Sequence, residues 1–277
     1  MTDRQVHINA VGQVQCADWY HRDGSGSDIR LPIEEGRQPR FMRAKRPGIG
    51  VSLRRVGRWL LGLVALFLVS GMALTLPLRW INPQTTSFIL QDDKRKEHQL
   101  SVWTDFDEIG DNLLLAAVAA EDQRFDQHLG LDIQSIRDSI EDSRRGDRLR
   151  GASTLTQQLA KNLYLWSGRS FLRKGLEAWL AVNLEVFLPK RRILVLYLNV
   201  VEFGPGIYGV SEAAHHFFDR EPAFLDEREA AMLAAVLPSP RRYKADEPTT
   251  YLLERQDWIR LQMARLKREQ WLYTIRR

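Results

Sequence analysis

Residues 117–158 decide the fold of this chain: they include Ala119-Ala120-Glu121-Asp122-Gln-Arg-Phe125-Asp-Gln-His128-Leu-Gly130 and end with Gly151-Ala-Ser153-Thr154-Leu-Thr156-Gln157-Gln158. Glu121 and Asp122 end an apolar run, where a buried acid is costly unless it has a purpose. If the helix continues, Glu121, Phe125 and His128 fall at i, i+4 and i+7 and share one face. The spacing predicts a carboxylate, an aromatic wall and an imidazole at the mouth of a cleft.

The position of Glu121 also predicts its acid strength. It lies near the C-terminal end of the expected helix, where the macrodipole disfavours an anion, so we expect a raised pKa for Glu121. A carboxylate tuned in this way suits general-base chemistry. On its own, a Glu-Asp pair at a helix end is more often a solvated terminus, so the other motifs have to decide.

Length, charge and cysteine content set wide limits. The chain has 277 residues, enough for one sizeable domain or two small ones with appendages. Its net charge of +5 indicates anionic partners, such as nucleic acid, anionic lipid or a phosphorylated substrate. The single cysteine, Cys16, excludes an internal disulfide and a cysteine-based zinc site.

An uncharged run predicts a membrane anchor. Residues 59–78 read WLLGLVALFLVSGMALTLPL, which is long enough to cross a bilayer as a helix. A dense basic flank precedes it, so the positive-inside rule places the N-terminus in the cytoplasm and exports the rest. The alternative is a cleaved signal peptide with a weak site at Gly71-Met-Ala73, but the apolar run is long for that and the preceding tail much longer.

The patterning predicts a mainly α-helical protein in three parts: a largely disordered basic cytoplasmic tail (1–58), a transmembrane helix (59–78) and an exported domain (79–277) with its core at about 100–250. Brief strands are expected at 85–90 and 100–103. Helices are expected at 112–125, 132–145, 154–165, 171–188, 190–200, 209–218, 226–237 and 249–272. The last is amphipathic and either lies on the membrane surface or, more commonly for such a helix, packs on the domain.

The stretch from Glu121 to Gly130 is the first of five motifs, and the second runs from Gly151 to Asn162. Thr154 and Gln157 fit a capping box, and the free N–H groups of the helix they begin suit a phosphate. Gln158 and Lys161 share a helix face and could meet the same anion. Alone, this motif would indicate only a capped amphipathic helix.

Three further motifs follow in order. Arg173-Lys174-x-x-Glu177 offers a guanidinium fork and an ammonium to a pyrophosphate, although such a triplet is usually a surface ion pair. Residues 190–209 contain Tyr197 and Asn199, interpreted as scaffold, and a loop at Gly204. Residues 229–240 form an apolar helix expected to be core.

Together the five motifs, spanning about Leu113 to Pro248, resemble the peptidoglycan glycosyltransferases of glycosyltransferase family 51. The resemblance implies a lysozyme-like, two-lobed helical domain. It implies that Glu121 is the general base that deprotonates the 4-hydroxyl of the acceptor sugar, with Glu177 in a supporting catalytic role near the donor. It assigns substrate binding to Asp122, Phe125, His128, Ser153, Thr154, Gln157, Gln158, Lys161, Asn162, Arg173 and Lys174, and structural roles to Gly130, Gly151, Tyr197, Asn199 and Gly204.

The reaction so implied polymerises lipid II into β-1,4-linked glycan by inversion, releasing undecaprenyl pyrophosphate. The resemblance implies a single-pass protein of the bacterial cytoplasmic (inner) membrane with a periplasmic catalytic domain. Its partners would be lipid II, the growing glycan strand, the membrane and other cell-wall synthesis or division proteins, but no nucleic acid. Residues 163–166 with Phe171 either dip into the membrane interface or pack on the core.

No tightly bound cofactor is expected, although Mg²⁺ or Mn²⁺ could help to neutralise the charge of the pyrophosphate. The adjacent His215 and His216 point in different directions on a helix, so we expect no metal site there. The absence of Ser-x-x-Lys and Lys-Thr-Gly predicts that the chain has no transpeptidase module.

Two other readings stay open. A membrane-anchored lytic transglycosylase or lysozyme-like hydrolase would also use a helix-end glutamate, but would not need the cations Lys161, Arg173 and Lys174. A catalytically dead scaffold would be expected to have lost Glu121, which is present.

Overall fold

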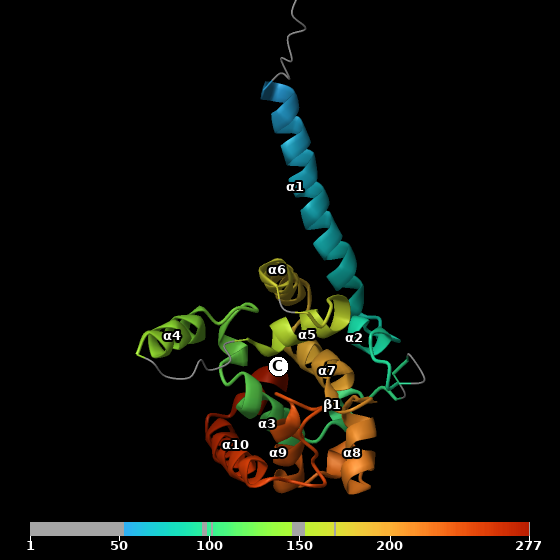
Figure 1. The fold of residues 1–277 in the computed structure, drawn as a ribbon, viewed down its shortest axis with the longest axis vertical. Helices are drawn as coiled ribbons and strands as arrows, with labels where there is room; N and C mark the ends of the chain where they lie inside the picture. The colour runs from blue at the N-terminus through green and yellow to red at the C-terminus, as the bar shows by residue number, and fades with distance from the viewer. Residues whose placement is uncertain (1–52, 96–98, 101, 146–152, 169, 277) are drawn as a thin grey trace, which may run out of the picture. The chain divides into compact units, whose positions relative to one another are not determined.

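The computed structural model describes residues 53–95, 99–100, 102–145, 153–168 and 170–276. The predicted tail, apart from its last residues, and Gly151 lie outside the described residues. The α-helices are α1 (Leu53–Thr75), α2 (Ser87–Leu90), α3 (Asp111–Glu121), α4 (Ile133–Arg144), α5 (Leu155–Tyr164), α6 (Phe171–Phe187), α7 (Lys190–Val200), α8 (Val210–Phe218), α9 (Glu227–Val236), α10 (Thr250–Arg268) and α11 (Trp271–Arg276). Short 3-10 turns lie at Leu76–Arg79, Phe106–Glu108, Phe125–Gln127 and Pro222–Phe224, and β1 (Glu202–Gly204) pairs antiparallel with β2 (Ile207–Tyr208). The mainly α prediction is confirmed (Figure 1).

Helix α3 is the centre of the hydrophobic core. Its residues from Leu113 to Ala119 are all buried, which fits its alanine- and leucine-rich sequence without a polar face. It packs against α9 and α10. Because α3 is enclosed on all sides, the position of its last residue, Glu121, is fixed by the core.

The helices fall into two groups, as a two-lobed domain requires. Helices α3, α9 and α10 pack together in one, and α5 packs against α6 in the other. Helix α7 contacts α5, α6 and α8 and is buried from Ile193 to Val200. The end of α3 and the start of α5 come together where the two groups meet, because Asp122 bonds the backbone N–H of Leu155 at 3.1 Å.

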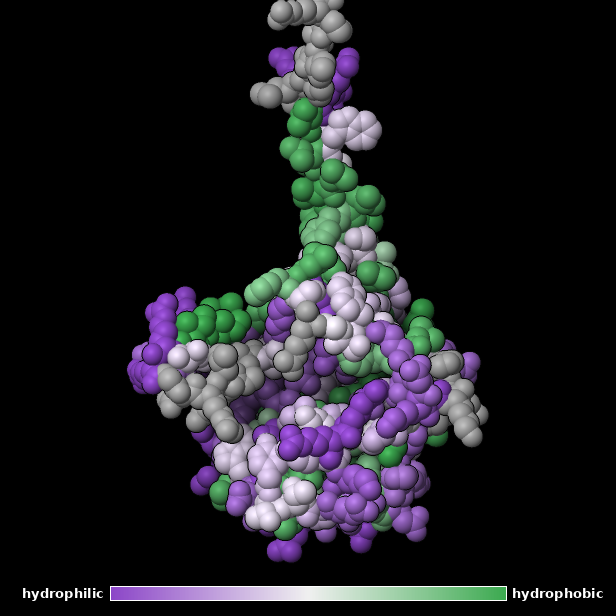
Figure 2. Space-filling model, viewed as in Figure 1, coloured by the Kyte–Doolittle hydropathy of each residue, from purple (hydrophilic) through white to green (hydrophobic). Residues whose placement is uncertain are grey.

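The apolar helix α1 packs on α6. Phe67 stacks on Trp179 with ring centroids 4.1 Å apart, and the Tyr164 hydroxyl donates to the Leu74 carbonyl at 2.6 Å. Along most of its length the hydrophobic side chains of α1 are exposed (Figure 2). Residues 54–79 are long and apolar enough to cross a membrane. The helix begins earlier than the predicted span of 59–78 and gives way to a 3-10 turn at Leu76.

Several predicted elements were wrong. Residues 87–90 form a helical turn capped by Thr86 instead of a strand, and the described residues of 100–103 form no strand. The expected helix 112–125 ends at Glu121. The C-terminal helix breaks after Arg268, where Gln270 has a positive φ of 54°. Helix α10 packs its apolar stripe on α9 and α3, so the packing alternative holds over the membrane-surface one.

Candidate active site

The end of α3 opens a cleft at Glu121. Asp122 leaves the helix with φ −159° and ψ 75°, and Phe125 lies in a separate 3-10 turn. The predicted shared face of Glu121, Phe125 and His128 is therefore wrong. Phe125 is fully buried, and His128 turns its Nε2 toward Asp122, 2.9 Å from Oδ1. Because the helix ends at Glu121, Phe125 and His128 do not lie on the same helix face as Glu121.

Glu121 is held by side chains from two other helices. Its Oε2 accepts from the Gln158 amide of α5 at 2.7 Å, and its Oε1 lies 3.4 Å from Nη2 of Arg255 on α10. The Tyr197 hydroxyl donates in turn to Oε1 of Gln158 at 3.2 Å. The Glu121 side chain is only 10% exposed.

Burial raises the pKa of the Glu121 carboxyl, and nearby Asp122 adds to this rise, while Gln158, Arg255 and Lys161 oppose it. The predicted direction is confirmed. Desolvation by burial, however, is the largest cause of the raised pKa, whereas the prediction rested on the helix dipole. A carboxyl in this setting is suited to take up a proton.

Asp122 connects the end of α3 to the start of α5. Its carboxylate accepts from His128 and from the Leu155 N–H. Thr154 and Gln157 form the predicted capping box, and the Thr154 hydroxyl donates to the Gly130 carbonyl at 2.6 Å. Two of the N–H groups at the start of α5 are thus already bonded within the protein. The expectation that they hold a phosphate is not supported.

A cluster of cations lies beside the cleft on α5 and α6. Glu177 is buried between its ion-pair partners Arg173, at 2.7 Å, and Lys174. Lys174 Nζ also donates to Ser153 Oγ at 2.7 Å, which joins the second and third motifs. Lys161 is nearby: burial lowers its pKa most, Arg173 and Lys174 lower it further, and Glu177 and Glu121 oppose the change.

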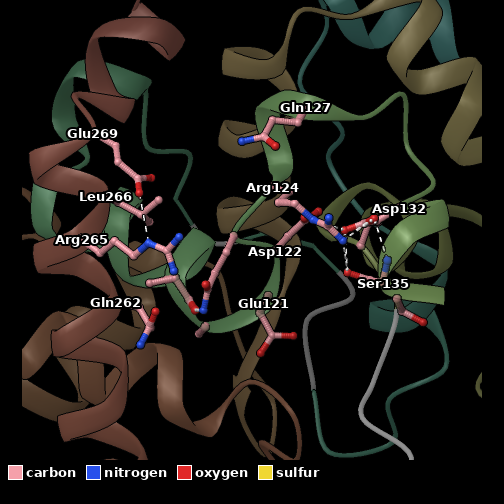
Figure 3. Close-up of a pocket in the computed structure, with 15 residues that line it drawn as sticks. Glu121, Asp122, Arg124, Gln127, Asp132, Ser135, Gln262, Arg265, Leu266 and Glu269 are labelled. Atoms are coloured by element: carbon pink, nitrogen blue, oxygen red, sulfur yellow. Dashed lines mark hydrogen bonds and ion pairs between the residues drawn. The ribbon is translucent and has the colours of Figure 1, made fainter. Parts of the chain in front are cut away.

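Glu121 and Ser153 line two adjoining cavities. One, of about 600 Å³, runs between Arg124, Asp132 and Ser135 on one side and α10 on the other (Figure 3). The other, of about 690 Å³, is lined by Gln158 and by α10 residues including Tyr251, Arg255 and Trp258. A ligand could therefore bind on either side of Glu121.

The structure brings together most of the residues predicted for the site, but several of them contact other protein groups and do not line the cleft. The ones at the cleft or its cation cluster are Glu121, Asp122, Ser153, Thr154, Gln158, Lys161, Arg173, Lys174 and Glu177. Phe125, Gln157 and Asn162 are buried away from these cavities, so direct substrate contacts predicted for them have no support in this structure.

The residues predicted as scaffold behave differently from one another. Asn199 clamps the backbone of Thr104 with bonds of 2.8 and 2.9 Å, as a structural residue does. Gly130 has φ 83°, and a Cβ there would lie 2.9 Å from the Ala181 carbonyl oxygen. Gly204 lies in β1. Tyr197, by contrast, reaches the site through Gln158.

Sequence reasoning missed Arg255, which lies 134 positions from Glu121. A signal was present: Leu252 and Ile259 are buried stripe residues of α10, and Arg255 falls between them at i+3 and i−4. A charge on the apolar side of a helix calls for a buried partner. Only the packing of α10 on α3 identifies that partner.

No metal cluster accompanies these groups: within the described ranges, no set of three or more His, Cys, Asp and Glu side chains is placed to hold an ion. His215 is exposed and lies 3.3 Å from Glu221.

Comparison with known proteins identifies the family of this chain. Residues 89–264 match the family model described as Transglycosylase. The chain belongs to this family, whose domain is a lysozyme-like helical fold.

Similar relatives carry a more particular name. A protein of Shewanella amazonensis named biosynthetic peptidoglycan transglycosylase is 48% identical over 76% of this chain and 87% of its own length. Proteins with the same name from Pseudomonas fluorescens and Ectopseudomonas mendocina are 44% and 43% identical, covering 77% and 81% of this chain and 92% and 95% of their own lengths.

Proposed function

We propose that this protein is a peptidoglycan glycosyltransferase that polymerises lipid II into β-1,4-linked glycan strands. The observation that carries this proposal is a buried carboxylate of raised pKa, Glu121, in a cleft that also has the cation cluster of Lys161, Arg173 and Lys174 at its side. Transfer from a sugar pyrophosphate needs a base at the attacking hydroxyl and positive charge at the leaving group. The names of the relatives agree with this function.

In the proposed reaction, the 4-hydroxyl oxygen of the incoming lipid II attacks the anomeric carbon of the growing strand. Glu121 takes the hydroxyl proton while the bond from the anomeric carbon to the pyrophosphate breaks. The lipid pyrophosphate leaves from the opposite face, so the α-linkage is inverted to β. Lys161, Arg173 and Lys174 stabilise the departing charge.

Glu177 acts through the cations in this scheme. Its carboxylate is buried between Arg173 and Lys174, and Lys174 also donates to Ser153 at the cleft. Because it is paired with two cations, a separate proton-transfer role is less suited to it than to Glu121. In this proposal, Mg²⁺ or Mn²⁺ at the pyrophosphate would be bound mainly by the substrate.

The lipid tails of donor and acceptor explain a membrane anchor. We place α1 across the bacterial cytoplasmic membrane with the N-terminus in the cytoplasm, on the basis of Arg54, Arg55 and Arg58 at its start. At the start of α6, Phe171 is fully exposed and Leu172 is 72% exposed, which suits contact with the membrane interface, whereas Leu163 and Leu165 pack on the core.

In the test, the protein is purified in detergent and incubated separately with two substrates, lipid II and finished glycan strands. The proposal expects gel-resolved chains from lipid II and finished strands left intact. Cleavage of finished strands with lipid II untouched would instead establish the lysozyme-like hydrolase. Inactivity on both, from a folded protein, would favour a scaffold that only binds precursor.

A further inference from the structure

Helix α10 contributes a cation to the site from outside the five sequence motifs. Arg255 Nη2 lies 3.4 Å from Oε1 of Glu121 and 3.5 Å from the carbonyl oxygen of Ala120, the preceding residue. The arginine side chain is 20% exposed. Since Gln158 holds the other oxygen of Glu121, the carboxylate is gripped from α5 and α10 at once.

The surroundings of Arg255 differ from those of its neighbours on α10. Arg260 pairs with Glu227 and Asp257, and Arg265 pairs with Glu269, all more exposed carboxylates. The Nε of Arg255 is buried and has no hydrogen-bond partner among the described residues. The same guanidinium reaches Glu121 and the Ala120 carbonyl through Nη2.

We propose that Arg255 is a positioning residue for Glu121, keeping the carboxylate ionised and aimed into the cleft while the acceptor hydroxyl binds. This inference rests on the proposed function, in which Glu121 is the base. It assigns part of the catalytic geometry to the C-terminal helix. It also explains why a charged side chain occupies the apolar stripe of α10.

The charges around Glu121 set the expected direction. Burial and Asp122 raise the pKa of Glu121, whereas Gln158 and Lys161 from α5 and Arg255 from α10 lower it. The buried hydroxyl of Tyr197, on α7, also faces this group, and its own pKa lies well above the usual value. Removing the cation of Arg255 therefore raises the pKa of Glu121, so a higher pH is needed to ionise the base.

The kinetic test compares pH profiles of kcat and KM for lipid II polymerisation by the full chain, Arg255→Gln and Arg255→Lys. The matched control is Arg260→Gln, a neutralisation on the same helix at a residue paired with Glu227 and Asp257. For Arg255→Gln we expect the acid limb of kcat to move up by about one pH unit. The rate should approach wild type at high pH with KM little changed, and Arg255→Lys should restore part of the shift.

Each other result overturns the proposal. An equal loss at every pH with a raised KM would mean that Arg255 contacts substrate directly. A profile unmoved like that of Arg260→Gln would mean that the ion pair is irrelevant to the base. A lowered Tm with an unmoved profile would assign Arg255 a structural role only.

A second readout needs no substrate and so separates this inference from the proposed function. A double-mutant cycle of thermal unfolding combines Glu121→Gln with Arg255→Gln. We expect Tm changes that are non-additive at neutral pH and become additive once Glu121 is protonated. Additive changes at both pH values would overturn the pairing even in an active enzyme.

Discussion

Glu121 shows at the scale of one residue how a folded protein can prepare a base. The core fixes the end of α3, so the carboxyl is buried and its pKa is raised, and Gln158 and Arg255 hold its two oxygens. A carboxylate of raised pKa binds a proton more readily than one in water. The same burial should make the ionised residue a burden on stability.

That burden can be measured with Glu121→Gln. Because the pKa of Glu121 is raised in the folded state, its contribution to stability is full below the ordinary value of 4.5 and is lost as pH rises through the folded pKa. The wild type should therefore lose stability relative to Glu121→Gln between acidic and neutral pH. Tm measured against pH for both proteins checks this; a constant difference would contradict it.

Tyr197 is the next residue in the series of hydrogen bonds that leads through Gln158 to Glu121. Tyr197→Phe removes the hydroxyl that donates to Gln158 and leaves that buried amide oxygen without this donor. We expect a loss of about 1 kcal/mol in unfolding free energy and a lower polymerisation rate.

The control is Tyr208→Phe, which removes a buried hydroxyl bonded to Asp92 rather than to Gln158. It should cost similar stability and leave the rate unchanged. Equal rate losses in both variants would show that Tyr197 acts only through the stability of the fold.

At the scale of elements, the junction of α3 and α5 depends on where helices stop. The capping box at Thr154 could be predicted because it is local in sequence. The end of α3 at Glu121 could not, because Asp122 leaves the helix to bond His128 and the Leu155 N–H, the latter 33 positions away. Helix periodicity carried the prediction past this point, and with it the incorrect shared face of Phe125 and His128.

Gly130 tests how far the junction depends on backbone shape. Gly130→Ala should lose about 2 kcal/mol or more in unfolding free energy, since its φ is 83° and its Cβ would meet the Ala181 carbonyl oxygen. Gly175→Ala in α6 is the control, because a Cβ there meets nothing within 4 Å. It should stabilise by about 0.5–1 kcal/mol. Equal effects of the two changes, measured by denaturant unfolding, would refute this account of Gly130.

At the scale of the whole molecule, long-range packing decided what the sequence left open. The mainly α class, most helix positions and the catalytic candidates followed from local periodicity and the motifs. The approach of Arg255 to Glu121 and the packing of α1 on α6 join segments more than 90 positions apart. No local pattern specifies such pairings, so only the fold reveals them.

The packing of α1 on α6 predicts that the anchor also orients the domain. A Cβ at Gly71 would lie 2.7 Å from Cζ2 of Trp179, so Gly71→Leu should separate the two helices at a cost of about 1–3 kcal/mol. We expect lower glycan yield from lipid vesicles without loss of membrane insertion.

Gly62→Leu serves as the control for this change, since a Cβ at Gly62 meets nothing within 4 Å. It should leave yield and insertion unchanged. Wild-type yield from Gly71→Leu would show that the contact between α1 and α6 does not affect catalysis.

Whether Glu121 is the base is tested most simply by comparing wild type with Glu121→Gln in lipid II polymerisation at neutral pH, with products resolved on a gel. We expect glycan chains from wild type and a rate at least about 100-fold lower from the variant. The variant should retain a Tm at or above that of wild type, which separates lost chemistry from lost fold. Chains formed by Glu121→Gln within a few-fold of the wild-type rate would contradict the assignment of Glu121 as the base.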